Sequence, residues 1–180
     1  MSSTRARSIL PPAPWLKLQA AGREELHPVA FRLGLLGNSR DRVESKLALM
    51  ERMAELDRAH PQLRRLVIQL LPHENRAIPR LEALFQWARR NLKFVADPPE
   101  IEYIARPIVT LWMGGGDCDD LATLAAAMLQ AAGFQTRFAL ATRNGQTSHV
   151  YVEVLPSARL ATSLAFDLTE PALGLRRVST

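Results

Sequence analysis

The stretch Gly114–Gly116 constrains this chain most, because it runs through Asp117 directly into Cys118, the only cysteine of the 180 residues. Residues 121–132 are mostly alanine and leucine, the strongest helix formers, and Gly133 is a typical helix stop. The apolar side chains recur three and four residues apart, as on one buried face of a helix. The sequence therefore predicts a core helix that carries a thiol in its first turn, on the buried side, after a backbone that can bend sharply.

The position predicted for Cys118 has chemical consequences. Unpaired N–H groups and the dipole at a helix N-terminus favour a thiolate, and the same N–H groups can hold an oxyanion. The carboxylates of Asp117, Asp119 and Asp120 suit a helix start, but their charge raises the pKa of a nearby thiol. A lone cysteine can also be a small buried apolar residue. The sequence leaves both interpretations of Cys118 open.

Length and composition exclude several classes of protein. A chain of 180 residues is long enough for one domain with an extension. No apolar run reaches the ~18–20 residues of a membrane span, and the N-terminus lacks the apolar stretch of a secretory signal. A single cysteine cannot form an intrachain disulfide. The net charge is +5, but the basic residues occur in scattered pairs without interleaved aromatics, which argues against nucleic-acid binding.

The chain divides into an extension and a domain. Residues 1–40 contain Pro11, Pro12 and Pro14 and do not form a self-supporting unit, so we expect an arm held by a neighbouring chain or wrapped around its own domain. Two short strands are expected within it, at 15–19 and 31–33. The domain spans residues 41–180. Its first half predicts helices over 41–59, 62–71, 79–92 and 108–113, with a long irregular connector at 94–107.

After Gly133 the apolar period changes from that of a helix to that of a strand. Strands are predicted over 134–141 and 147–154, joined by a hairpin turn at 144–145, and a third over 163–168. On the second strand His149 shares a face with Tyr151 and Glu153, and on the third Asp167 faces away from the apolar residues. The predicted fold is therefore α+β, with a helical lobe and the Cys118 helix packed on a small antiparallel sheet.

A thiol, an imidazole and a carboxylate can converge where this helix starts beside the sheet. Cys118 would attack an acyl carbon, His149 would move the proton, and Asp167 would orient the imidazole. The N–H of Cys118 would hold the oxyanion, with Trp112 and Asp117 at the cleft wall. Each residue alone also has an ordinary structural explanation. We expect no metal and no cofactor, because the aspartates point apart on a helix and no phosphate-binding lysine follows the glycines.

A family resemblance joins these blocks. It is carried by residues 116–122, the helix end at 132–134, residues 148–154 and residues 166–171. Together they resemble the transglutaminase-like superfamily of papain-fold cysteine enzymes, and most of all the small transglutaminase-like proteins of tailed bacteriophages and prophages. The resemblance runs from about Ile78 to Gly174 and implies a Cys118–His149–Asp167 triad.

The same resemblance implies a function in a phage virion. We expect a tail-associated cysteine hydrolase that cleaves a peptide or isopeptide bond, made in the cytoplasm of the bacterial host and bound to other virion proteins through its arm. Amine transfer instead of hydrolysis stays open. The alternative is a structural tail or morphogenesis component that keeps the fold and binds its neighbours with little or no catalysis.

Overall fold

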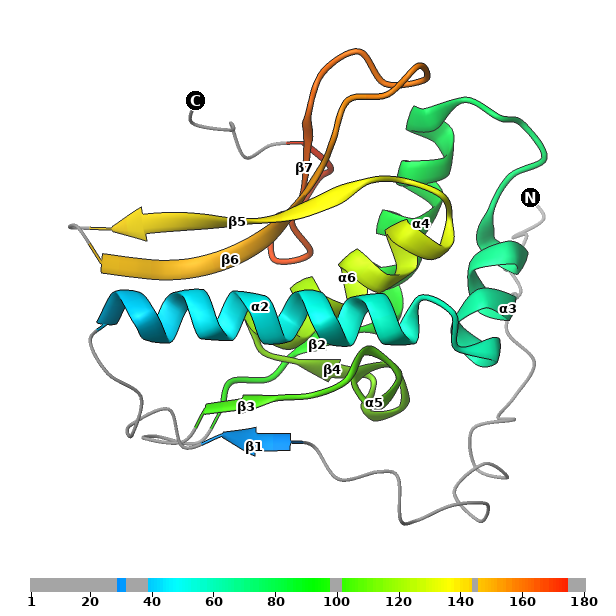
Figure 1. Cartoon of the computed structure of the whole chain (residues 1–180). Coiled ribbons are helices and arrows are strands. Elements are labelled where there is room, and N and C mark those ends of the chain that lie inside the picture. Colours follow the sequence, from blue (N-terminus) through cyan, green and yellow to red (C-terminus); the bar gives the residue numbers. More distant parts are fainter. Residues whose placement is uncertain (1–28, 32–38, 98–101, 144–145, 175–180) are drawn as a thin grey trace, which may run out of the picture.

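The computed structural model describes residues 29–31, 39–97, 102–143 and 146–174. Figure 1 shows helices gathered around one central helix, with a twisted sheet on one side. In chain order the elements are β1 (Val29–Phe31), α2 (Ser39–Asp57), α3 (Pro61–Leu70), α4 (Ala77–Asn91), β2 (Lys93–Phe94), β3 (Glu102–Ile104), α5 (Pro107–Met113), β4 (Gly115–Gly116), α6 (Cys118–Ala131), β5 (Thr136–Arg143), β6 (Gln146–Val154) and β7 (Leu164–Phe166). This confirms the predicted α+β class.

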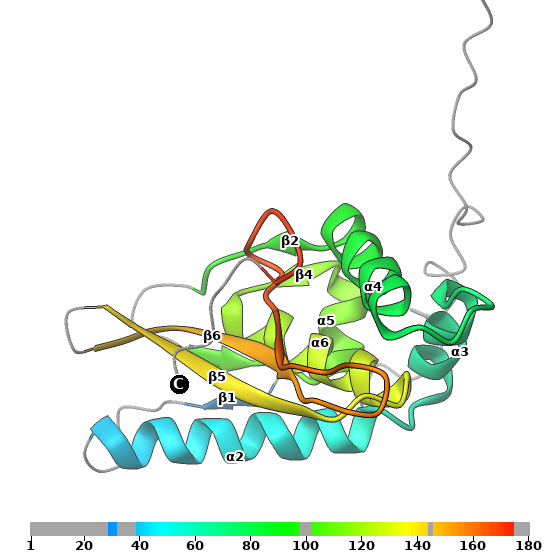
Figure 2. The ribbon, with the colours of Figure 1, turned by 90° about the horizontal axis from the view of Figure 1, so that it is seen from above.

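Helix α6 is the central element. Residues 119–129 are all buried, and the helix contacts α2, α3, α4 and α5 as well as β4, β5 and β6. Figure 2 places it in the middle of the other elements. The sequence predicted one buried face only. The helix is instead buried on every side, because the small side chains of Ala122, Ala125 and Ala126 let neighbouring elements approach closely.

The other helices begin and end within two residues of the predicted bounds. Pro61 opens α3 and His60 caps it, since the Nδ1 atom of His60 accepts the N–H of Gln62 at 3.3 Å. Helix α4 starts at Ala77, two residues earlier than predicted, so Pro79 lies inside its first turn, where its missing N–H costs nothing. Proline signals therefore located the helical lobe.

The main sheet has the strand order β5–β6–β7, and both pairs are antiparallel. The central strand β6 places His149 opposite Ala141 and Val152 opposite Phe166. The valines of β6 face the core, as the period of two predicted. The predicted turn at 144–145 lies outside the described residues.

The glycine stretch contains a close backbone approach as well as a bend. Gly114 ends α5 with a φ of 73°, a left-handed conformation that favours glycine. Gly115 and Gly116 then form β4, which pairs with β2 in parallel. A Cβ atom on Gly115 would overlap the carbonyl group of Lys93, and one on Gly116 would overlap the side chain of Asp120. The sequence predicted the bend but not this pairing.

Part of the predicted extension belongs to the fold. Strand β1 pairs antiparallel with β3, so residues 29–31 lie against their own domain. Strand β3 interrupts the connector predicted to be irregular. The rest of the extension before Ser39, including the expected strand at 15–19, lies outside the described residues.

Among the described helices, none combines the length and the apolar character that crossing a bilayer requires.

Candidate functional site

The start of α6 is fixed by Asp117. Its carboxylate accepts the backbone N–H groups of Asp119 at 2.9 Å and Asp120 at 3.2 Å, which is the bonding of a helix N-cap. Burial raises the pKa of Asp117 above its usual value. The cap does not accept the N–H of Cys118, the donor that the sequence analysis assigned to an oxyanion. Asp117 therefore has a structural role that fixes where the thiol lies.

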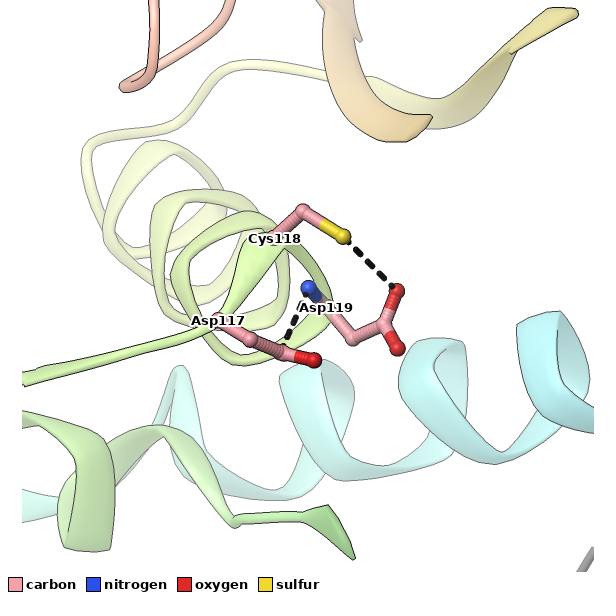
Figure 3. Close-up of side chains that lie close together, drawn as sticks. All are labelled: Asp117, Cys118 and Asp119. Atoms are coloured by element: carbon pink, nitrogen blue, oxygen red, sulfur yellow. Dashed lines mark hydrogen bonds between the residues drawn. The ribbon is translucent and has the colours of Figure 1, made fainter. Parts of the chain in front are cut away.

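The thiol of Cys118 is half-buried and points toward a carboxylate. Its sulfur donates to Oδ1 of Asp119 across 3.6 Å, and Figure 3 shows the two side chains turned toward each other. Burial raises the pKa of Cys118 to about 12, and the negative charges of Asp119 and Asp117 add to that rise. The backbone N–H of Val150 and the charge of Lys46 act in the opposite direction. At rest the group is a thiol, so the favourable effect of the helix start is outweighed.

His149 and Asp167 form a hydrogen-bonded pair. The Nε2 atom of His149 lies 2.8 Å from Oδ2 of Asp167. The other carboxylate oxygen accepts the backbone N–H of Thr169 at 3.0 Å and its hydroxyl at 2.7 Å. Burial alone would raise the pKa of Asp167, but these hydrogen bonds outweigh it and lower the pKa to about 2. An ionised carboxylate can only accept, so Nε2 carries the proton and Nδ1 is left as the basic nitrogen.

Two observations connect the thiol to this pair. The backbone N–H that faces the sulfur belongs to Val150, the residue that follows His149 on β6. Leu121, one helical turn after Cys118, lines the same cleft as His149. The first turn of α6 therefore lies beside the middle of β6, while Cys118 itself is not among the described residues that line this cleft, and the triad stays a prediction.

An open cleft lies beside the pair, and we call it the His149 cleft. Its volume is about 390 Å³, and its lining residues are Ala88, Arg89, Leu92, Phe94, Leu121, His149, Leu168 and Thr169. Most of these side chains are apolar, and Phe94 is 59% exposed at the rim. The cleft is large enough for one or two side chains of a peptide and too small for a folded domain.

Trp112 does not line this cleft. Its indole N–H donates to Oε1 of Gln62 at 2.9 Å, and its ring packs edge-on against His60. The sequence analysis placed Trp112 at the cleft wall because it precedes Cys118 by six residues. Helix α5 instead turns the indole toward the start of α3, so Trp112 supports the helical lobe.

The acidic groups around the thiol have partners in the protein. Polar atoms of Asp117, Cys118 and Asp119 lie within 4.8 Å of one another, a spacing that could accommodate a cation. However, Asp117 caps the helix and Asp119 forms an ion pair with Lys46 of α2. The cluster is thus explained by capping and pairing, with no ion required.

Three residues of the site were missed in the sequence. Thr169 follows Asp167 by two residues, a spacing typical of a side chain that bonds its own turn, and this local signal could have found it. Lys46 lies on α2 and Arg89 on α4. Both reach the site only through tertiary packing, so no local pattern points to them.

Asp120 provides a test of the electrostatics at this helix start. The side chain is buried and its Oδ1 accepts the N–H of Ala105 at 2.7 Å. Burial raises the pKa of Asp120 to about 6, and the charges of Asp117 and Asp97 contribute. A carboxyl whose pKa is raised by folding favours the folded state at low pH, and this advantage is lost as the pH rises through about 6.

We therefore expect Asp120→Asn to stabilise the protein at pH 8 by about 1–2 kcal/mol and to change little at pH 4.5. The amide oxygen still accepts from Ala105 but adds no charge to the interior. Thermal unfolding at the two pH values measures the difference. A variant that is equally destabilised at both would contradict the charge argument.

Comparison with known proteins gives one family. Residues 64–159, which are 96 of the 180 residues and just over half of the chain, match the model described as the transglutaminase-like superfamily. A crystal structure from Cytophaga hutchinsonii, described as that of a "Putative Cysteine Protease", aligns with this chain at 18% sequence identity and a TM-score of 0.47. The alignment covers 61% of this chain and 37% of the Cytophaga hutchinsonii chain. This chain thus spans little more than a third of that protein. No curated protein matches the chain significantly.

Proposed function

The chain belongs to the transglutaminase-like superfamily, whose papain-like fold the sequence predicted, and from this membership we propose that it is a cysteine hydrolase acting through Cys118, His149 and Asp167. The observation that carries the proposal is the 2.8 Å hydrogen bond between His149 and Asp167 beside an open cleft and the Cys118 helix start. The reaction would be cleavage of a peptide or isopeptide bond.

The roles follow from the geometry and charge of the site. Nδ1 of His149 accepts the thiol proton while the sulfur of Cys118 attacks the acyl carbon, and the N–H of Cys118 donates to the oxyanion. The proton then passes to the leaving amine as the carbon–nitrogen bond breaks, and water releases the thioester. Because the pKa of the thiol is about 12, ionisation accompanies attack and does not precede it. Asp167 keeps the imidazole oriented and stabilises its charged form.

The setting we propose is a tailed bacteriophage. The support is the resemblance of the cysteine and histidine blocks to small phage and prophage proteins of this superfamily, together with a basic, proline-rich N-terminal extension. The chain would join the virion tail after synthesis in the host cytoplasm, contact tail proteins through residues 1–40, and cleave a virion protein or a cell-wall peptide. The described residues that line the cleft include no acidic side chain to bind a second, amine substrate, so we favour hydrolysis over cross-linking.

The hydrolase proposal is tested by cleavage of a defined peptide pool. We expect the purified chain to release products that mass spectrometry detects, and Cys118→Ala to release none while keeping its thermal unfolding temperature. Equal product from both proteins would contradict the proposal, because the chain has no second thiol.

A structural role is the second candidate, and the resting thiol favours it. A pKa of about 12 and a hydrogen bond to Asp119 are typical of an unreactive cysteine. Phage that carry Cys118→Ala would separate the two candidates. Normal assembly and full infectivity would support the structural component, and loss of infectivity with intact particles would support the hydrolase.

A further inference from the structure

Arg89 brings a permanent positive charge into the His149 cleft. The residue lies in the last turn of α4 and is exposed, its side chain lines the cleft, and the preceding Ala88 is buried in the core. Its Nη1 atom donates to the carbonyl oxygen of Leu168 at 3.0 Å. Among the described residues that line the cleft, Arg89 is the one that carries a guanidinium group.

The hydrogen bond to Leu168 fixes the guanidinium group without using its full capacity. A guanidinium has five N–H donors in a planar fork that matches a carboxylate, and the bond to Leu168 uses one of them. The carboxylate of Asp167, the residue before Leu168, already accepts from His149 and twice from Thr169. A carboxylate that enters the cleft with a substrate would therefore find a preorganised donor.

The remaining walls are apolar. Ala88, Leu92 and Leu121 line the cleft, and Phe94 presents an exposed ring at its rim. An apolar surface beside one fixed cation selects a ligand with an apolar side chain next to a negative charge. A neutral polar peptide would leave the apolar walls in contact with water and would not engage the guanidinium.

We propose that the His149 cleft selects an acidic peptide, in which Arg89 binds a carboxylate and Phe94 and Leu92 contact a neighbouring apolar side chain. The inference rests on the proposed hydrolase and names the substrate class of the same site. The carboxylate can come from a glutamate or aspartate side chain or from a free C-terminus, and the experiment below separates these sources.

Arg89 also has a purely structural interpretation, because its bond to Leu168 ties α4 to the loop that holds Asp167. Arg89→Gln separates the two roles. The amide of glutamine can still donate to the Leu168 carbonyl, but it carries no charge. Arg90→Gln is the matched control, because Arg90 is the next residue of α4, is exposed, and is not among the described residues that line the cleft.

The probes are chloroacetyl dipeptides that alkylate Cys118, and mass spectrometry assigns the adduct because the chain has one cysteine. Chloroacetyl-Leu-Glu-amide is compared with chloroacetyl-Leu-Gln-amide, and chloroacetyl-Leu-Leu is compared as free acid and as amide. The concentration dependence gives an apparent KI and a limiting rate for each probe.

We expect at least one carboxylate probe to have a KI about fivefold to tenfold lower than its neutral partner, as for one partly exposed charge-assisted hydrogen bond. The preference should disappear in Arg89→Gln and persist in Arg90→Gln, and the probe pair that shows it identifies the source of the carboxylate. Equal KI values for charged and neutral probes would overturn the proposal. An Arg89→Gln variant in which the KI of every probe rises equally would also overturn it, since that result indicates that Arg89 only ties α4 to the loop that holds Asp167.

The limiting rate tests the hydrolase separately. If Cys118 is alkylated no faster than a model thiol of the same pKa, the imidazole gives no assistance and the proposed function fails. The KI preference is still measurable in that case, so the two results are distinguishable.

Discussion

Replacing His149 with alanine is expected to lower kcat for peptide cleavage by about a thousandfold or more. The reason is the resting state of the nucleophile. With a thiol pKa of about 12, fewer than about one Cys118 in ten thousand is ionised at pH 7.5. In the proposed mechanism the imidazole accepts the proton during attack, because Asp119, the carboxylate to which the resting thiol donates, is already paired with Lys46. Steady-state kinetics with the cleaved peptide measures the loss.

The control for this substitution is His73→Ala, which removes an exposed histidine that is not among the described residues lining the cleft and should leave kcat unchanged. A His149→Ala enzyme with more than a tenth of the original kcat would contradict the assignment of the base. Activity that rises tenfold per pH unit in the variant would identify hydroxide-driven ionisation of the thiol as its remaining route.

Replacing Gly115 with alanine is expected to destabilise the fold by about 3 kcal/mol or more, or to prevent folding. The added Cβ would overlap the carbonyl group of Lys93, which is backbone and cannot move aside like a flexible side chain. The pairing of β2 with β4 would then open at the segment that leads into Cys118. Chemical denaturation measures the change in the free energy of unfolding.

Gly133→Ala provides the matched control. Gly133 has a φ of 87°, and an added Cβ there would meet nothing within 4 Å. Alanine at this position should destabilise the fold only through the left-handed backbone conformation, by about 1–2 kcal/mol. If Gly115→Ala were no worse than Gly133→Ala, the close approach of the two backbones would not be what requires glycine at position 115.

The parts of the fold that were predicted are those with local signals. Prolines and glycines locate the ends of helices to within two residues, and the change of period after Gly133 predicts the sheet. The same reasoning put Cys118 in the first turn of a helix. Alternation along two strands also put His149 and Asp167 on one face, where the structure has them hydrogen-bonded.

The features that were missed depend on residues far apart in the sequence. Strand β4 consists of two glycines, which carry no strand signal, and it exists only because β2 lies beside it. The ion pair of Lys46 with Asp119 and the burial of α6 on every side also follow from tertiary packing. Trp112 is a further case. It lies six residues before Cys118, but the sequence did not predict that α5 directs its indole toward the start of α3.

The hydrogen bond between Arg89 and Leu168 joins positions 79 residues apart. One wall of the His149 cleft therefore comes from α4 and the other from the residues after β7, which are made later during translation. A nascent chain still attached to the ribosome before residue 167 has the cysteine helix but lacks both the aspartate and the far wall. The proposed hydrolysis would therefore require synthesis to pass Thr169, well beyond the cysteine helix.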